Sequence, residues 1–198
     1  MGKRGRRRPG ILATVGLVVE GDTEFAALPL LHRRRLIAGC PPLKATNLGG
    51  VGSHKTPAAI ANQVAPHVIA HQVAGRPRVV VCVDREQRHD CSPSFARAIH
   101  GELVKVYVAK DRPVTALATV SVVDADRAFE AWLLAGSGQT FDGQLGRKQR
   151  KGVVELEALL RRPYRKTVDG PQLFSKLDLQ VARRGSKSLD KLLRELGV

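Results

Sequence analysis

The chain has 198 residues, of which 43% are hydrophobic and 26% charged, and its formal net charge is +15 at pH 7. This length is sufficient for one well-buried core and marginal for two. The sequence contains no run of about 18 apolar residues, so we expect no transmembrane helix. Only 4% of the residues are aromatic, which argues against a base-stacking surface of the kind that single-strand-binding proteins use.

The positive charge extends well beyond the N-terminus. Five positive charges lie within residues 1–10 (MGKRGRRRPG), and removing them from +15 still leaves a net charge of +10 on the remainder. A surface this basic attracts polyanions, because it neutralises phosphates and releases their counterions. We therefore expect nucleic acid, DNA or RNA, as a partner. The alternative is that the charge provides solubility in an arginine-rich proteome.

The basic N-terminal arm does not resemble a signal peptide. The segment ILATVGLVVE follows it and runs into an acid rather than into a small-residue cleavage site. The three cysteines, Cys40, Cys82 and Cys91, are too scattered for a disulfide framework, and no CxxC pair suggests zinc. These features favour a reducing, cytoplasmic setting.

Apolar, β-branched runs alternate with helix-length segments from residue 11 onwards. We expect strands at 11–20, 43–48, 78–84, 104–110 and 118–125. We expect helices at 22–36, 56–73, 92–103 and 126–136. Apolar strands separated by helices are typical of a parallel sheet with helices on both faces, so the predicted fold class is α/β.

Several of these helices carry recognisable end signals. Asp22 or Thr23 is the expected N-cap of the first helix, which Pro29 should interrupt. Thr56 precedes a proline and marks the start of the second helix, and Ser92 does the same for the third.

The composition changes from residue 137. Residues 137–152 read as a loop, and helical patterns follow at 153–160, 171–184 and 188–196. We therefore divide the chain into three parts: a basic arm (1–10), an α/β core (11–136), and a loop with a helical C-terminal segment packed on the core (137–198).

Carboxylates follow two of the predicted strands directly. Glu20 ends the first strand, Asp84 ends the third, and Glu86 lies two residues further on. Ligands of open parallel sheets bind outside the carboxyl ends of the strands, near the switch in strand order. Converging carboxylates repel one another unless a cation neutralises them, and Mg²⁺ prefers oxygen ligands. Glu20, Asp84 and Glu86 are therefore candidate ligands for Mg²⁺ (or Mn²⁺).

A further acidic group, Asp124, Asp126 and Glu130, follows the last predicted strand, and the last two share a helix face. The alternative reading of such acids is helix capping, which contributes roughly 0.5–2 kcal/mol. We prefer that reading for Asp126, and we interpret Glu24 as a first-turn helix acid. Helix capping explains Glu20 less well, since a capping residue does not need an apolar strand leading straight into it.

The stretches VVEGDTE and VVVCVDRE together resemble the TOPRIM fold, which topoisomerases, DnaG-type primases and OLD-family nucleases share. That family has a glutamate, usually followed by glycine, at the end of its first strand and Asp-x-Asp at the end of a later one. Here the second motif is Asp84-Arg85-Glu86, a glutamate variant. Past the arm, the chain is similar to small bacterial TOPRIM-like proteins through VVEGDTE, VDRE, DRAFEAWLLA, PYRKTVDG and a C-terminal S-x-S-L helix.

The resemblance implies a Mg²⁺-dependent nuclease that cleaves nucleic-acid phosphodiesters. Glu20, Asp84 and Glu86 would hold the metal, Glu130 would complete or orient the site, and Lys166 would stabilise the transition-state charge. In the resemblance, Trp132 of FEAWLLA packs into the core.

Related proteins are often encoded beside ABC-type ATPases in phage-defence loci. An ABC-type ATPase is therefore an expected partner, and a homo-oligomer is compatible with this reading. The alternative function is a non-catalytic subunit that binds nucleic acid or a partner within an ATPase-containing complex. The chain's length and the lack of a recognisable nucleotide site disfavour a primase-like enzyme.

The segment GGVGSHKT has the glycines of a phosphate-binding loop, but His54 stands where GxxxxGK[ST] requires glycine. This excludes nucleotide binding by that motif. Its main-chain amides, helped by Lys55, are either a cradle for a nucleic-acid phosphate or part of a plain connection. Arg85 and Lys176 are further candidates for contact with nucleic acid, and Lys176 is the second choice after Lys166 for stabilising the phosphate.

His67 and His71 are spaced i, i+4 and therefore share one helix face. No glutamate of an HExxH motif and no third ligand accompany them. We therefore expect histidines on the surface or in a groove rather than zinc ligands.

Overall fold

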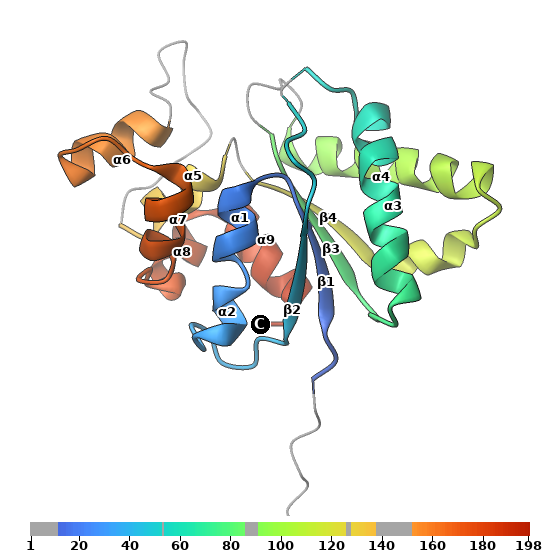
Figure 1. Ribbon diagram of the computed structural model, residues 1–198, viewed down its shortest axis with the longest axis horizontal. Helices are drawn as coiled ribbons and strands as arrows, with labels where there is room; N and C mark the ends of the chain where they lie inside the picture. Colours follow the sequence, from blue (N-terminus) through green and yellow to red (C-terminus); the bar gives the residue numbers. More distant parts are fainter. Residues whose placement is uncertain (1–11, 53, 86–90, 126–127, 138–151) are drawn as a thin grey trace, which may run out of the picture.

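The computed structural model describes residues 12–52, 54–85, 91–125, 128–137 and 152–198. Within these residues, four parallel strands form one sheet in the order β2-β1-β3-β4. The strands are β1 (Val15–Val19), β2 (Leu43–Asn47), β3 (Val79–Asp84) and β4 (Val120–Ala125). Helices lie on both faces of the sheet (Figure 1). The predicted α/β class is confirmed, and the core is Rossmann-like.

The two faces of the sheet have separate sets of helices. One face carries α3 (Pro57–Val73), α4 (Ser92–Ala109) and the 3-10 helix η1 (Val114–Thr119). The other face carries α1 (Asp22–Ala27), α2 (Leu30–Arg33), α5 (Phe129–Ala135), α6 (Gly152–Leu160), α7 (Lys166–Phe174), α8 (Leu179–Gly185) and α9 (Lys187–Leu196) (Figure 1). Helices from both sides of the 137–151 segment thus share one hydrophobic cluster.

Alternation along the strands explains the two clusters. Val80 and Cys82 of β3 pack under the C-terminal helices, whereas Val79, Val81 and Val83 pack under α3 and α4. Every residue of β1 is buried, as expected of a central parallel strand with both faces covered.

The order of connections creates a switch point between β1 and β3. The chain leaves β1 through α1 and α2 on one face to reach β2, and then returns through α3 on the opposite face to β3, on the other side of β1. Crossovers that run in opposite directions from a central strand lie on opposite faces. Their loops separate at the carboxyl ends of β1 and β3, where such folds bind ligands.

The strand predicted at 104–110 is wrong, because residues 104–109 continue α4 and Lys110 is its C-cap. The Val-Lys-Val-Tyr-Val alternation suggested a period of two, yet one buried helix face recurs every four residues at Phe95, Ile99, Leu103 and Tyr107. Packing of this face overrides the β propensity of the valines. The N-cap is Cys91 rather than the expected Ser92, whose hydroxyl has another role described below.

Other helix ends are confirmed in part. The Thr56 hydroxyl caps α3 by accepting from the Ala59 N–H at 3.2 Å, and the chain breaks between α1 and α2 at Pro29 as expected. The N-cap of α1 is Gly21 rather than Asp22 or Thr23. The helix predicted at 171–184 is two helices, because Asp178 starts α8 by accepting from two main-chain N–H groups.

Trp132 is fully buried, as the resemblance implied. Its indole N–H donates to Ser188 Oγ at 2.8 Å, and its ring meets Phe129 edge to face with 5.7 Å between centroids. Among the residues that the structure describes, no helix is long and apolar enough to cross a membrane.

Candidate functional site

Glu20 and Asp84 lie together at the switch point. Glu20 directly follows β1 and is 8% exposed, and Asp84 is the last residue of β3. Glu20 Oε2 accepts a hydrogen bond from the Asp84 main-chain N–H at 2.8 Å, and Oε1 accepts one from the Val51 N–H at 3.1 Å. The Glu20 carboxylate therefore joins the ends of β1 and β3 to the loop after β2.

The glycine-rich loop after β2 is shaped around Glu20. Gly49, Gly50 and Gly52 have φ values of 75°, 96° and 72°, a left-handed conformation that favours glycine. This path brings the Gly50 N–H to the main-chain carbonyl of Glu20 at 2.8 Å, next to the Val51 contact with its carboxylate. Two amides of the suggested phosphate cradle thus bind an internal glutamate in this structure.

Lys55 contacts the same loop through Gln63. Its ammonium donates to Gln63 Oε1 on α3 at 2.7 Å, and the Gln63 amide donates to the carbonyls of Leu48 and Gly50 at 3.0 and 3.1 Å. Lys55 is half-buried in this arrangement. Its predicted contact with nucleic acid stays a prediction.

Glu24 and Glu130 add two more buried carboxyls to the site. They are 6% and 3% exposed and come from α1 and α5. Burial raises the pKa of Glu24 to about 7; a main-chain hydrogen bond opposes this shift, the charges of Glu130 and Glu20 add to it, and Lys166 opposes it. Glu24 does lie in the first turn of α1, but its role as a mere helix acid does not explain its burial. Sequence analysis therefore missed Glu24 as a member of this site.

Lys166 is brought to this acidic cluster, which we define as Glu20, Glu24, Asp84 and Glu130. Its Nζ lies 3.4 Å from Glu130 Oε1, although its side chain remains 60% exposed. Partial burial lowers the pKa of Lys166, but the charge of Glu130 and its hydrogen bond, with Asp84 and Glu24, outweigh that effect and raise the pKa. Lys166 is therefore a protonated cation at neutral pH, as its predicted role requires.

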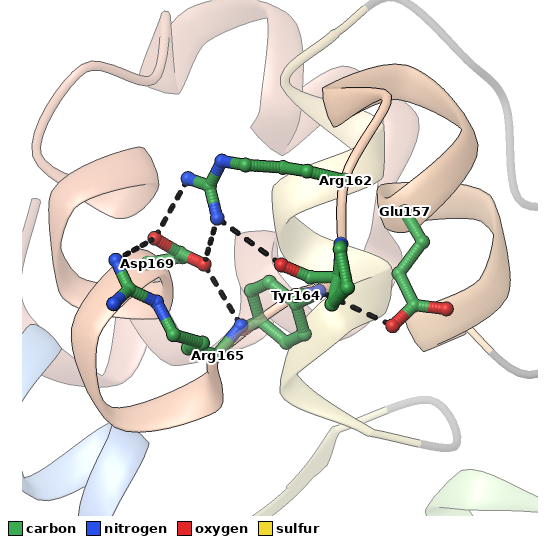
Figure 2. A network of polar contacts seen from close by, with 6 residues as sticks. Glu157, Arg162, Tyr164, Arg165 and Asp169 are labelled. Atoms are coloured by element: carbon green, nitrogen blue, oxygen red, sulfur yellow. Dashed lines mark hydrogen bonds and ion pairs between the residues drawn. The ribbon is translucent and has the colours of Figure 1, made fainter.

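A polar network fixes the turn that leads into Lys166 (Figure 2). Arg162 makes a two-pronged contact with Asp169, at 2.7 and 2.9 Å, and the main-chain N–H of Arg165 donates to Asp169 Oδ2 at 2.8 Å. These contacts hold the pKa of Asp169 well below its usual range. Glu157 of α6 accepts from the Tyr164 N–H at 3.2 Å. Sequence reasoning missed this network, although PYRKTVDG contains most of it.

Tyr164 belongs to the network through its main chain, and the charges of Glu130 and Glu24 act on its side chain. It is 8% exposed, and its buried hydroxyl has no hydrogen-bond partner among the described residues. Burial raises its pKa, and the charges of Glu130, Glu24 and Asp169 raise it further. Gly170 makes room for it, because a Cβ there would lie 2.9 Å from the hydroxyl oxygen.

Asp124 occupies the end of β4, on the α4 side of the sheet. It is 1% exposed, Oδ1 accepts from the Ser92 hydroxyl at 2.7 Å, and Oδ2 has no hydrogen-bond partner in the described part of the chain. Burial raises its pKa, against the effect of the Ser92 hydrogen bond. Two further predicted acids, Glu86 and Asp126, lie outside the described residues.

The remaining candidates lie in different places. The Arg85 N–H donates to the Ala125 carbonyl at 3.1 Å, which extends the β3–β4 pairing towards the acidic cluster. Lys176 is exposed and follows the C-cap of α7, whereas Lys166 begins that helix. The two lysines therefore stand at opposite ends of α7, and Lys176 is not brought to the acids.

His71 is not a surface histidine. It is 2% exposed and lies between Thr46 and Arg76, whose contacts with its two ring nitrogens are both 3.0 Å long. Burial lowers its pKa to about 4, and the charge of Arg76 adds to this effect. Gly16 of β1 is required beside it, since a Cβ there would lie 2.6 Å from the imidazole.

Carboxylate oxygens are the ligands that a hard divalent cation prefers, and the charges of Glu130 and Glu20 act on Glu24 across this site. Each oxygen of Glu20 has two lone pairs and accepts one hydrogen bond here, so it keeps capacity for a second partner. Among the described residues, no three His, Cys, Asp or Glu side chains are close enough together to hold a metal ion as they stand. A bound ion would therefore require side-chain adjustment or a ligand from outside this set.

No family model, no curated protein and no solved structure matches this chain. The family suggested by the sequence motifs therefore stays a resemblance. Any statement about function depends on the geometry of the acidic cluster and on its surroundings.

Proposed function

We propose that the chain is a TOPRIM-like, Mg²⁺-dependent nuclease that acts on DNA or RNA at the acidic cluster. One observation carries the proposal: Glu20 and Asp84 meet at the switch point of the sheet, beside two further buried glutamates and a protonated lysine. Buried carboxyl groups whose charges act on one another repel unless protons or a cation neutralise them.

In this proposal, Glu20 and Asp84 hold the ion, together with Glu86, and Glu130 and Glu24 complete the site. The ion would activate water and neutralise charge on the phosphate oxygens. Lys166 supplies a fixed positive charge beside Glu130, and burial of the glutamates excludes bulk water from their side of the site.

A cleavage assay with matched variants tests this proposal. Purified protein should nick plasmid DNA or degrade RNA with Mg²⁺ or Mn²⁺, and Asp84→Asn should reduce the rate by about 100-fold or more. Asp84→Asn keeps the main-chain N–H that donates to Glu20. Glu20→Gln is a less clean change, because the NH₂ group of the new side chain would face one of the two main-chain N–H donors. Glu102→Gln on α4 is the control and should cleave like the wild type. Equal rates for the Asp84 variant and the wild type would reject the proposal.

A second function, a non-catalytic subunit of an ATPase-containing complex, also has support. Both oxygens of Glu20 accept main-chain hydrogen bonds, so Glu20 has a structural role that needs no metal. On this view the protein shifts the mobility of nucleic acid, or co-purifies with an ABC-type ATPase, without cutting. Expression in the native cytoplasm with an affinity tag, followed by the cleavage assay on the recovered material, separates the two functions.

A further inference from the structure

The turn between α6 and α7 presents several cations beside the acidic cluster. Arg161, Arg162, Arg165 and Lys166 fall within six residues, and all four are exposed. Among the described residues, Asp169 of α7 is the only carboxylate that forms ion pairs with the arginines of this turn. We define Arg162, Arg165 and Lys166 as the basic rim.

Asp169 pairs with two members of the basic rim, Arg162 and Arg165, and its single charge does not neutralise both. The Asp169 side chain is 2% exposed, whereas those of Arg162 and Arg165 are 46% and 66% exposed. Arg162 uses three N–H contacts, two to Asp169 and one to the Pro163 carbonyl, out of the five donors of a guanidinium group. Figure 2 shows the guanidinium groups of Arg162 and Arg165 approaching the Asp169 carboxylate from different directions. One buried charge thus orients two exposed cations.

Arg165 is the least committed member of the rim. Its guanidinium approaches Asp169 only to 3.9 Å, while its main-chain N–H makes the close contact at 2.8 Å. The Arg165 side chain is therefore close to Asp169 without a short contact, and 66% of it remains exposed to solvent. Lys166 follows it directly and reaches Glu130, so the rim leads from Asp169 into the acidic cluster.

We infer that the basic rim is a binding site for the phosphodiester backbone of a nucleic-acid strand. The rim lies next to carboxylates that repel phosphate, so binding in the absence of a cation must depend on the arginines. Arginine forks fit phosphate oxygens, and contacts of this kind position a strand without reading its sequence. A linear polyanion suits cations arranged along a turn that leads to the acidic cluster. The inference names how the substrate of the proposed nuclease is held, and to that extent it rests on the proposed function.

Fluorescence anisotropy of a labelled single-stranded oligonucleotide, measured in EDTA at several salt concentrations, tests the rim without cleavage. Arg165→Gln should weaken binding about 3–10-fold and reduce the slope of log K against log salt by about 1. This variant keeps the main-chain hydrogen bond to Asp169 and the Arg162 pair, so the turn should remain folded. Arg112→Gln, after α4 on the opposite face, is the control and should bind like the wild type. Unchanged affinity and salt slope for Arg165→Gln would overturn the inference.

A competition arm separates nucleic acid from an acidic protein partner. Unlabelled oligonucleotide should displace the probe at much lower charge concentration than polyglutamate, and equal displacement would reject the phosphodiester assignment. The cleavage assay distinguishes the two proposals. Loss of binding in Arg165→Gln, with no cleavage by the wild type, upholds the rim and rejects the nuclease. If Arg165→Gln binds and cleaves normally, the nuclease is upheld and the role of the rim is rejected.

Discussion

Replacing Glu24 with glutamine tests whether its carboxyl group is buried with a raised pKa beside the other acids. The pKa of this carboxyl is raised from 4.5 to about 7, first by burial and then, against a main-chain hydrogen bond, by Glu130 and Glu20. Because the folded-state pKa lies above the unfolded-state value, the folded protein binds more protons between these two values. The free energy of unfolding contributed by Glu24 therefore falls as the pH rises from 4.5 through 7.

The expected size of the effect follows from the shift. One pKa unit corresponds to about 1.4 kcal/mol, so ionised Glu24 lowers the free energy of unfolding by up to about 3 kcal/mol above pH 7. Glu24→Gln removes the charge and keeps the side-chain size. We expect the variant to be about 1–3 kcal/mol more stable than the wild type at pH 8. For a chain of this length, each kcal/mol raises the Tm by about 2–4 °C.

Urea unfolding at pH 5, 6, 7 and 8 measures this difference. The chain has one tryptophan, Trp132, which is fully buried and therefore reports unfolding by its fluorescence. Glu102→Gln, the same chemical change on α4, serves as the control and should follow the wild type at each pH. If Glu24→Gln also follows the wild type from pH 5 to 8, Glu24 does not share a buried site with other acids, and the reasoning about the cluster is refuted.

Two further predictions concern stability. His71, whose pKa is lowered from 6.5 to about 4 by burial and a neighbouring arginine, should lose up to about 3 kcal/mol of stability as the pH falls through this range. His71→Gln should lack that loss in urea unfolding; an unchanged acid profile would contradict its burial as a neutral group. The pH dependence of stability from His71 has the opposite sign to that from Glu24. Each contribution is therefore measured as the difference in free energy of unfolding between the variant and the wild type. Gly170→Ala should lower the free energy of unfolding by about 1–3 kcal/mol, because its Cβ would lie 2.5 Å from Thr23 Cγ2. Gly101→Ala, where a Cβ meets nothing within 4 Å, should be neutral or stabilising by up to about 1 kcal/mol, and equal losses for both glycines would refute the packing argument.

The convergence of Glu20 and Asp84 could be predicted because it follows from topology. Apolar strands separated by helices predict a parallel sheet, and parallel strands end at the same edge. The strand predicted at 104–110 failed because valines alternate with other residues on a helix whose buried face is set by packing against the sheet. Local propensity did not contain that information.

The surroundings of Glu24 and Lys166 could not be predicted in the same way. Glu24 is buried because α7 packs on α1, and these helices are far apart in the sequence. The network around Asp169 similarly depends on a turn whose arginines look like ordinary surface charges in the sequence. Contacts between distant segments decided both the pKa of Glu24 and the orientation of the basic rim.

A crystal structure of the protein soaked in Mn²⁺ tests the central claim most directly. The account predicts an anomalous peak between the carboxylates of Glu20 and Asp84, at a metal–oxygen distance of about 2.0–2.3 Å, and the loss of that peak in Asp84→Asn. Ordered density in which Glu20 still binds only the N–H groups of Val51 and Asp84, with no peak at the acidic cluster, would contradict it.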